Sequence, residues 1–122
     1  MPIIRVDIPE GHDRDTKDAL YSVLHDAIAE TWAKEHIWIA LREKYSPPGN
    51  TQVVMTVDLR PGRGGEAERL RALFDQVQSE FERLIGTSKK DLIVLIRDFP
   101  DEACLSEGEP LPSLESLAPA VG

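Results

Sequence analysis

The chain has 122 residues, a single cysteine and a formal net charge of −8. This length suits one compact domain, and the acidic balance argues against binding to nucleic acids or anionic membranes, because both need basic patches. With Cys104 as the only cysteine, an internal disulfide is excluded and a reducing compartment is favoured. No apolar run reaches the length of a membrane span and no signal-peptide pattern is present, so we expect a cytoplasmic protein.

Pro2 directly follows Met1 and opens an apolar, β-branched run over 3–8 that predicts a strand. Removal of the initiator methionine, which is usual before a small residue, would leave a free secondary amine on the proline ring. An α-amino group titrates at about pH 7.7–8.0 in model peptides, a range that suits acid/base chemistry. Proline is a common residue, so this interpretation depends on support from the rest of the chain.

The elements expected next complete a β-α-β unit. After the strand over 3–8, a polar turn with Asp15 or Thr16 as the N-cap leads into a helix. The apolar face of this helix has the helical period and ends at Trp32. A second strand is expected over 36–43.

The same order then repeats. The segment 47–50, with two prolines, a glycine and an asparagine, breaks the chain before a strand over 53–59. An apolar stripe over 70–85 predicts a second helix, and Gly86 is a good residue to end it. The last long strand is expected over 91–98.

The two halves also resemble each other residue by residue. Val6-Asp7-Ile8 resembles Val57-Asp58-Leu59, and 37–43 resembles 92–98, because both segments end in arginine followed by an acid. A crossover of this length most often joins parallel strands. We therefore expect an α/β (α+β) fold with a four-stranded, mainly parallel sheet and two helices on one face.

Residues 1–122 are expected to form a single domain, with units 2–46 and 53–99 and a C-terminal arm over 100–122. The continuous apolar run over 92–96 indicates an inner strand that is buried on both faces. Association with further copies of the chain would cover the second face and the edges of the sheet.

Arg60 and Arg63 lie between the third expected strand and the second expected helix. A guanidinium presents a planar fork of donors that fits a carboxylate, and free N–H groups at a helix start add to such a site. One arginine would hold a substrate carboxylate while the other polarises a carbonyl oxygen. An Arg-x-x-Arg loop alone is more often a solvated surface loop, here beside Glu66 and Glu68, so this interpretation depends on Pro2 and the repeat.

Metal and nucleophile chemistry find little support. Three histidines and one cysteine at unrelated spacings do not support a metal site, and no cofactor is expected. Cys104 has no surrounding His/Asp constellation and is more typical of a small buried residue. Trp32 and Trp38 are expected in the core or at an interface.

Pro2, the two β-α-β units and the chain length together resemble the tautomerase superfamily, whose members use an amino-terminal proline as acid or base. The element Arg60-Pro61-Gly62-Arg63 is similar to the carboxylate-binding arginine pair of the cis-3-chloroacrylic acid dehalogenase subgroup. Pro48-Gly49-Asn50 and the stretch from Asp98 to Pro112 resemble that subgroup too. The resemblance implies a homotrimer with sites near subunit interfaces.

The chain departs from the dehalogenase pattern at several site positions. Ile28 stands where the dehalogenases have an orienting histidine, and His25 lies one turn earlier. Leu95 replaces a tyrosine, and Glu107 lies one residue from the position of a water-activating glutamate. The chain also resembles malonate semialdehyde decarboxylase, in which an acid at the start of the second strand belongs to the site, and Glu35 is the nearest candidate here.

Three functions are open from the sequence. The leading hypothesis is a tautomerase-like enzyme in which Pro2 is the general acid/base on a 2-oxo acid or enol that Arg60 and Arg63 bind and polarise. The second is hydration, dehalogenation or decarboxylation of a three-carbon unsaturated or oxo acid, which release of chloride or carbon dioxide would reveal. The third is a non-catalytic member of the superfamily, for which retention of Met1 would change nothing.

Overall fold

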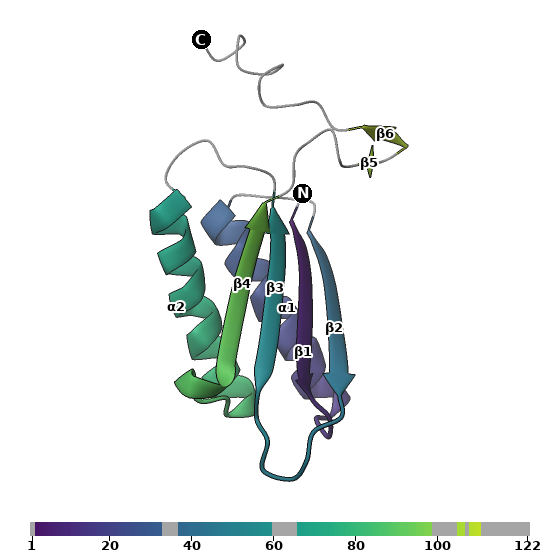
Figure 1. Ribbon diagram of the computed structural model, residues 1–122, viewed down its shortest axis with the longest axis vertical. Helices are drawn as coiled ribbons and strands as arrows, with labels where there is room; N and C mark the ends of the chain where they lie inside the picture. The colour runs from purple at the N-terminus through teal and green to yellow at the C-terminus, as the bar shows by residue number, and fades with distance from the viewer. Residues whose placement is uncertain (1, 33–36, 60–65, 99–104, 107, 111–122) are drawn as a thin grey trace.

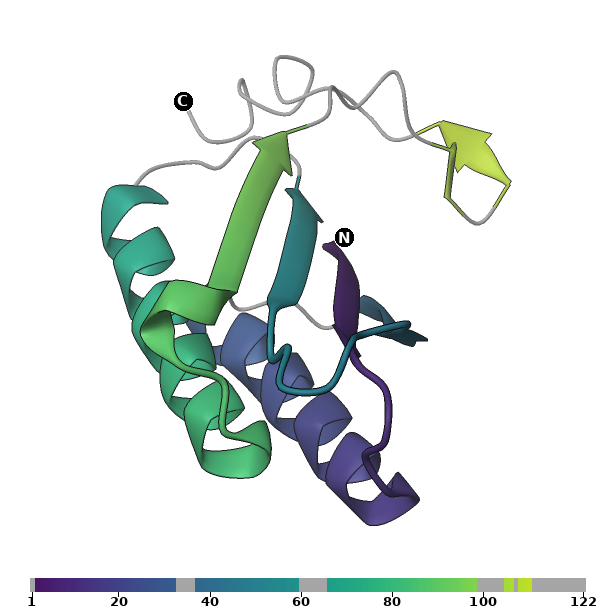
Figure 2. The same cartoon turned by 60° about the horizontal axis from the view of Figure 1, so that its bottom comes forward.

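The computed structural model describes residues 2–32, 37–59, 66–98, 105–106 and 108–110. A four-stranded sheet forms one layer, and two helices pack on one of its faces and leave the other face open (Figures 1 and 2). The strands of this sheet are β1 (Ile3–Pro9), β2 (Trp38–Lys44), β3 (Val53–Leu59) and β4 (Leu92–Asp98). The helices are α1 (Arg14–Trp32) and α2 (Glu66–Ile85), and a single-turn 3-10 helix η1 (Lys89–Asp91) precedes β4.

The strand order is β2-β1-β3-β4. β1 pairs with β2 and β3 pairs with β4 in parallel, whereas β1 and β3 are antiparallel. Both β-α-β units of the expected fold class are therefore confirmed. In the arm, β5 (Leu105–Ser106) and β6 (Glu109–Pro110) pair with each other as a short antiparallel ladder.

The register between β1 and β3 relates the two units by a local pseudo-twofold axis. Ile3 pairs with Asp58 and Asp7 pairs with Val54, so the centre of this symmetry lies between Arg5 and Thr56. The symmetry places Asp7 and Asp58, which the sequence repeat equates, at equivalent positions. One consequence is that the two units point in opposite directions along the sheet, so equivalent residues lie at opposite ends.

The helix ends show how local chemistry sets the boundaries. The backbone N–H of Thr16 donates to the Asp13 carboxylate at 2.7 Å, so Asp13 is the N-cap of α1, and the prediction of Asp15 or Thr16 is wrong by two residues or more. Hydrogen bonding from the Thr16 side chain, and then from its backbone N–H, holds the pKa of Asp13 below its usual value. Gly86 ends α2 as predicted: its φ is 70°, and its N–H donates to the Glu82 carbonyl at 3.0 Å.

The core lies between the helices and the sheet. Alternate residues of the inner strands face the helices, since the side chains of a strand point to opposite faces in turn. Trp32 belongs to this core, as predicted, with 6% of its surface exposed. The fully buried side chains are Ile4, Val6, Ile8, Leu20, Leu24, Ile28, Val53, Met55, Val57, Leu73, Val77 and Phe81.

Phe81 provides a direct test of this core. It is fully buried, so Phe81→Ala should lower the free energy of unfolding by about 3–5 kcal/mol, through lost burial and the cavity that remains. Urea denaturation measures this loss. Phe74→Ala is the matched control two turns earlier on α2, where the side chain is 38% exposed and the expected loss is smaller, about 1–2 kcal/mol. Equal losses in the two variants would contradict this packing.

β4 differs from the prediction. The apolar run over 92–96 indicates an inner strand, but β4 is an edge strand, and the inner strands are β1 and β3. Leu92, Val94 and Ile96 are half-buried on the helix side, whereas Ile93 and Leu95 are 53% and 50% exposed. The run is continuous because both faces of this edge strand carry apolar side chains, and within the described chain one of those faces is uncovered.

Candidate active site

Pro2 lies at the end of the sheet where β1 and β2 begin and where β3 and β4 end (Figure 1). It is buried, and its carbonyl accepts a hydrogen bond of 3.0 Å from the backbone N–H of Trp38. This bond joins the residue before β1 to the first residue of β2. This hydrogen bond thus fixes the position of Pro2 relative to the sheet.

The open face next to Pro2 carries an ion-pair cluster. The Asp58 carboxylate accepts from Arg5 Nη1 at 2.6 Å and from Arg97 Nε at 2.9 Å. Asp58 is the register partner of both Ile3 and Arg97, so the cluster spans β1, β3 and β4 one residue from Pro2. Sequence analysis did not single out these three residues as site residues, although the repeated arginine-acid endings of the second and fourth strands were a signal.

Four of the predicted site residues, Arg60, Arg63, Glu35 and Glu107, lie outside the described residues. Their chain neighbours are nevertheless informative. Arg60 directly follows Leu59, the last residue of β3, which ends where Pro2 lies. The segment that contains Glu35 joins α1 to β2, which begins at this same end. Two chain segments, the one that contains Arg60 and Arg63 and the one that contains Glu35, therefore adjoin strands at their Pro2 ends.

His25 is the one predicted binding residue besides Pro2 that the structure describes. It is half-buried on α1, and its Nδ1 lies 3.6 Å from the Asp26 carboxylate. The helix runs toward the Pro2 end and finishes at Trp32, seven residues later, which is about 10 Å along the helix axis. The structure thus gives His25 no contact with Pro2, and its role stays a prediction.

Trp38 adds an aromatic side chain to the Pro2 end. It is 65% exposed on the open face, opposite Ile3. It does not belong to the core, so of the two expectations for this residue only an interface position remains.

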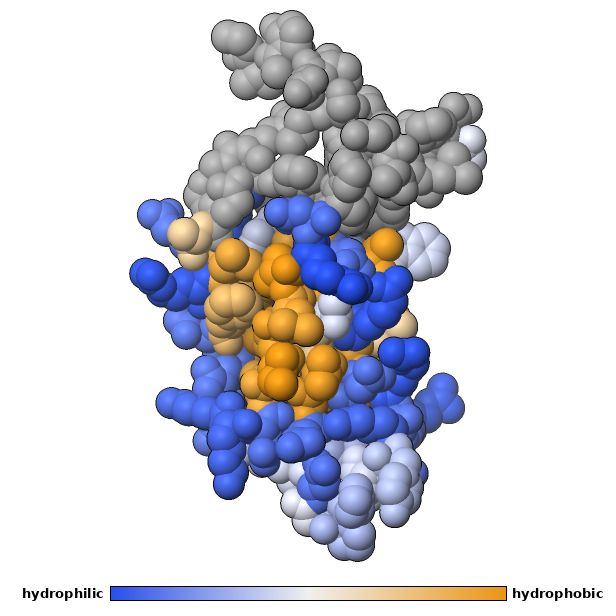
Figure 3. All heavy atoms as spheres, viewed as in Figure 1, coloured by the Kyte–Doolittle hydropathy of each residue, from blue (hydrophilic) through white to orange (hydrophobic). Residues whose placement is uncertain are grey.

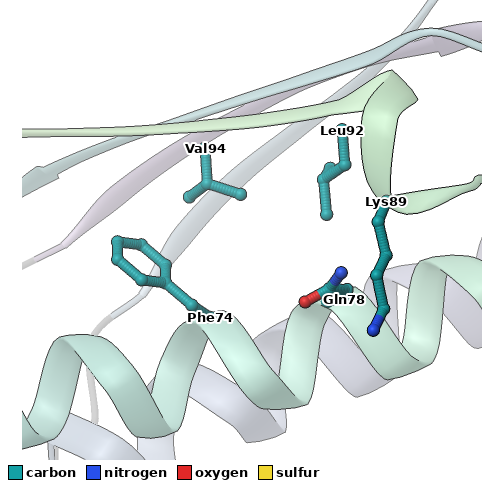
Figure 4. A pocket seen from close by; sticks show the side chains of 5 residues that line it. All are labelled: Phe74, Gln78, Lys89, Leu92 and Val94. Carbon is teal, nitrogen blue, oxygen red and sulfur yellow. The ribbon is translucent and has the colours of Figure 1, made fainter.

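A hollow of about 240 Å³ lies elsewhere, between α2 and the free edge of β4 (Figure 4). Its walls are Phe74, Gln78, Lys89, Leu92 and Val94. Leu92 pairs with Val53, at the end of the sheet opposite to Pro2, so this hollow is not part of the Pro2 site.

The carboxyl groups with a lowered pKa also lie at the opposite end. The Lys17 ammonium donates to Glu43 at 2.6 Å and the Gly11 N–H donates at 3.1 Å, and these bonds hold the pKa of Glu43 below its usual value. A hydrogen bond from Thr51 does the same for Asp91. These groups tie loops to strands. Within the described ranges, no three His, Cys, Asp or Glu side chains are grouped so that they would hold a metal ion.

Solved structures share this architecture along the whole chain. A fused 4-OT wild-type symmetric trimer is 24% identical, with a TM-score of 0.76 over 93% of this chain and 98% of that chain. Pt0534 inactivated by 2-oxo-3-pentynoate is 18% identical, with a TM-score of 0.79 over 94% of this chain and 98% of that chain. FG41 malonate semialdehyde decarboxylase inhibited by 3-bromopropiolate is 18% identical, with a TM-score of 0.69 over 97% of this chain and 96% of that chain.

The chain has the tautomerase fold. Residues 2–44 also match the family model described as Tautomerase enzyme, and this match spans the first β-α-β unit from Pro2 to the end of β2. Together the family match and the structural likeness support the tautomerase superfamily that the sequence resembles. None of the curated proteins searched matches the chain. In the described part of the chain, no helix is both long enough and apolar enough to span a membrane.

Proposed function

We propose that the protein is a tautomerase-like enzyme in which Pro2, made amino-terminal by removal of Met1, is the general acid/base. Its substrate is a small carboxylate with an adjacent enol, carbonyl or double bond, such as a 2-oxo acid. The observation that carries this proposal is the burial of Pro2 at the sheet end from which β3 leads into Arg60. Ketonisation of a simple enol-pyruvate by the processed protein and by its Pro2→Ala variant tests it.

The proposed chemistry follows from the properties of the Pro2 amine and of the arginine guanidinium groups. Burial disfavours the ammonium form of an amine, and cationic arginines act in the same direction, so a neutral Pro2 nitrogen can accept a proton from an enol. Arg60 and Arg63 bind the carboxylate and stabilise the negative charge that develops on the neighbouring oxygen. His25, Glu35 and Glu107 remain secondary candidates for orienting the substrate.

Decarboxylation of a three-carbon oxo acid is the second candidate. It is favoured by the likeness to FG41 malonate semialdehyde decarboxylase along nearly the whole of both chains. Hydration or dehalogenation, as in the cis-3-chloroacrylic acid dehalogenase subgroup, uses the same proline and arginines. Carbon dioxide or chloride release distinguishes these reactions from simple tautomerisation.

We further propose a cytoplasmic homotrimer. Four of the similar solved structures are symmetric or asymmetric trimers of fused 4-OT. On this chain, apolar side chains gather in the middle of the open sheet face and charged side chains surround them (Figure 3). Val54, Ile93 and Leu95 belong to this face, and further copies would cover it.

The arginine clamp gives a separate prediction. Arg60→Ala and Arg63→Ala should each lower kcat/KM by about 10- to 100-fold, because each removes a charge-assisted hydrogen bond to the substrate. Steady-state ultraviolet assays with an enol-pyruvate measure this loss. Arg71→Ala, at an exposed position on α2, is the control and should match the wild type. Indistinguishable kinetics in all three variants would exclude the clamp.

A further inference from the structure

The two ends of the open sheet face differ in charge. At the Pro2 end, Asp58 lies between Arg5 and Arg97, and its side chain is only 18% exposed beneath them. At the opposite end, the only ion-pair partner of Asp7 among the described residues is Arg42, at 3.1 Å. The first cluster has two arginines and one aspartate and so carries a formal charge of +1. The second has one arginine and one aspartate and is neutral.

The pseudo-twofold symmetry identifies the residue that makes the difference. Asp58 with Arg97 is the symmetry equivalent of Asp7 with Arg42, since each acid faces its arginine across a parallel strand pair. Arg5 sits at the centre, opposite Thr56, where the symmetry breaks. From that central position Arg5 donates to Asp58 and so adds its charge to the end that contains Pro2.

We propose that Asp58 is a positioning residue for Pro2. Its carboxylate joins the ends of β1, β3 and β4 and limits the positive charge beside the amino-terminal amine. This inference deepens the proposed function and rests on it. Asp58 also directly precedes Leu59 and Arg60, so the same ion pairs hold the strand end from which the proposed clamp departs.

The sign of the effect follows from the charges. Asp58→Asn leaves two uncompensated guanidiniums near Pro2, which disfavours the ammonium and lowers the pKa of the Pro2 nitrogen. Arg97→Gln removes one cation and raises that pKa. Asp58 is the register partner of Ile3, the residue after Pro2. For charges separated by on the order of 10 Å, Coulomb's law gives a shift of about 0.3–1 pH unit, depending on the effective dielectric constant.

Other charges surround Pro2 and stay constant in these variants. On the described elements, Asp98 ends β4 at the same end of the sheet. Pro2 packs against β2 through Trp38, which is uncharged. In the sequence, the segments 33–36, 60–65 and 99–104, which lie outside the described residues, contain the further ionisable residues Lys34, Glu35, His36, Arg60, Arg63, Asp101 and Glu102.

The test is a direct titration of Pro2 in the full-length protein labelled with ¹⁵N-proline. The amino-terminal amine resonates far from the amide nitrogens of the other prolines, so NMR follows it whether or not a substrate is known. Asp7→Asn and Arg42→Gln are the matched controls, since they break the equivalent pair about 13 Å further along β1. Mass spectrometry verifies the removal of Met1, and light scattering and thermal unfolding verify assembly and folding.

We expect opposite shifts in Asp58→Asn and Arg97→Gln and none in the two controls, with the same displacements in the pH profile of kcat/KM. Equal titration curves in Asp58→Asn and Asp7→Asn would overturn the inference while leaving a Pro2-dependent activity intact. A normal set of shifts without Pro2-dependent turnover would instead overturn the proposed function. If Asp58→Asn does not fold, the Pro2 titration curves of Arg97→Gln and Arg42→Gln are compared instead. Both arginine side chains are largely exposed, so we expect these two variants to fold.

Discussion

The Pro2→Ala variant should ketonise an enol-pyruvate at least about 100-fold more slowly than the processed wild-type protein, within the range for general acid/base groups. Alanine still permits removal of Met1, but it replaces a ring-bound secondary amine with a mobile primary amine. A protein with an amino-terminal extension should be equally slow, because an amide nitrogen is not basic. The ultraviolet decay of the enol measures all three rates.

The matched control for this variant is Pro9→Ala. Pro9 is also buried, but it lies at the opposite end of β1, so its replacement should affect stability and leave turnover unchanged. Equal activity of Pro2→Ala and the wild type would exclude Pro2 as the acid/base. If the extended protein also kept full activity, a different enzymatic mechanism would replace the present one. If the wild type also failed to turn over the enol-pyruvate and the three-carbon acids, the non-catalytic hypothesis would replace it.

Leu95→Asp should convert the proposed trimer into monomers at micromolar concentration, as measured by light scattering. Leu95 is half-exposed in the apolar part of the open face, and covering a carboxylate there without a partner costs several kcal/mol. Because the resemblance implies sites near subunit interfaces, turnover should fall together with assembly.

Tyr21→Asp is the control for assembly. Tyr21 is 44% exposed on α1, which covers the opposite face of the sheet, so this variant should remain trimeric. A monomeric wild-type protein would contradict the homotrimer itself. A trimeric Leu95→Asp variant would show that another surface of the chain makes the contact.

The ion pairs on the open face show where prediction from sequence stops. The arginine-acid endings of the second and fourth strands are visible as a repeat, yet nothing local indicates that Arg97 and Arg5 meet at Asp58. Asp58 lies 53 residues from Arg5 and 39 residues from Arg97. That meeting depends on the antiparallel register of β1 and β3, which long-range packing decides.

By itself, the sequence determined the β-α-β repeat, the helix-covered core and the position of Pro2 at a strand start, because apolar periodicity and turn residues act over a few neighbouring positions. Only the tertiary structure decided that β4 is an edge strand, that Asp13 caps α1, and that Arg5 and Arg97 meet at Asp58 near the Pro2 end. Strand order and register arise from contacts between distant segments, in which burial of the core outweighs local preference.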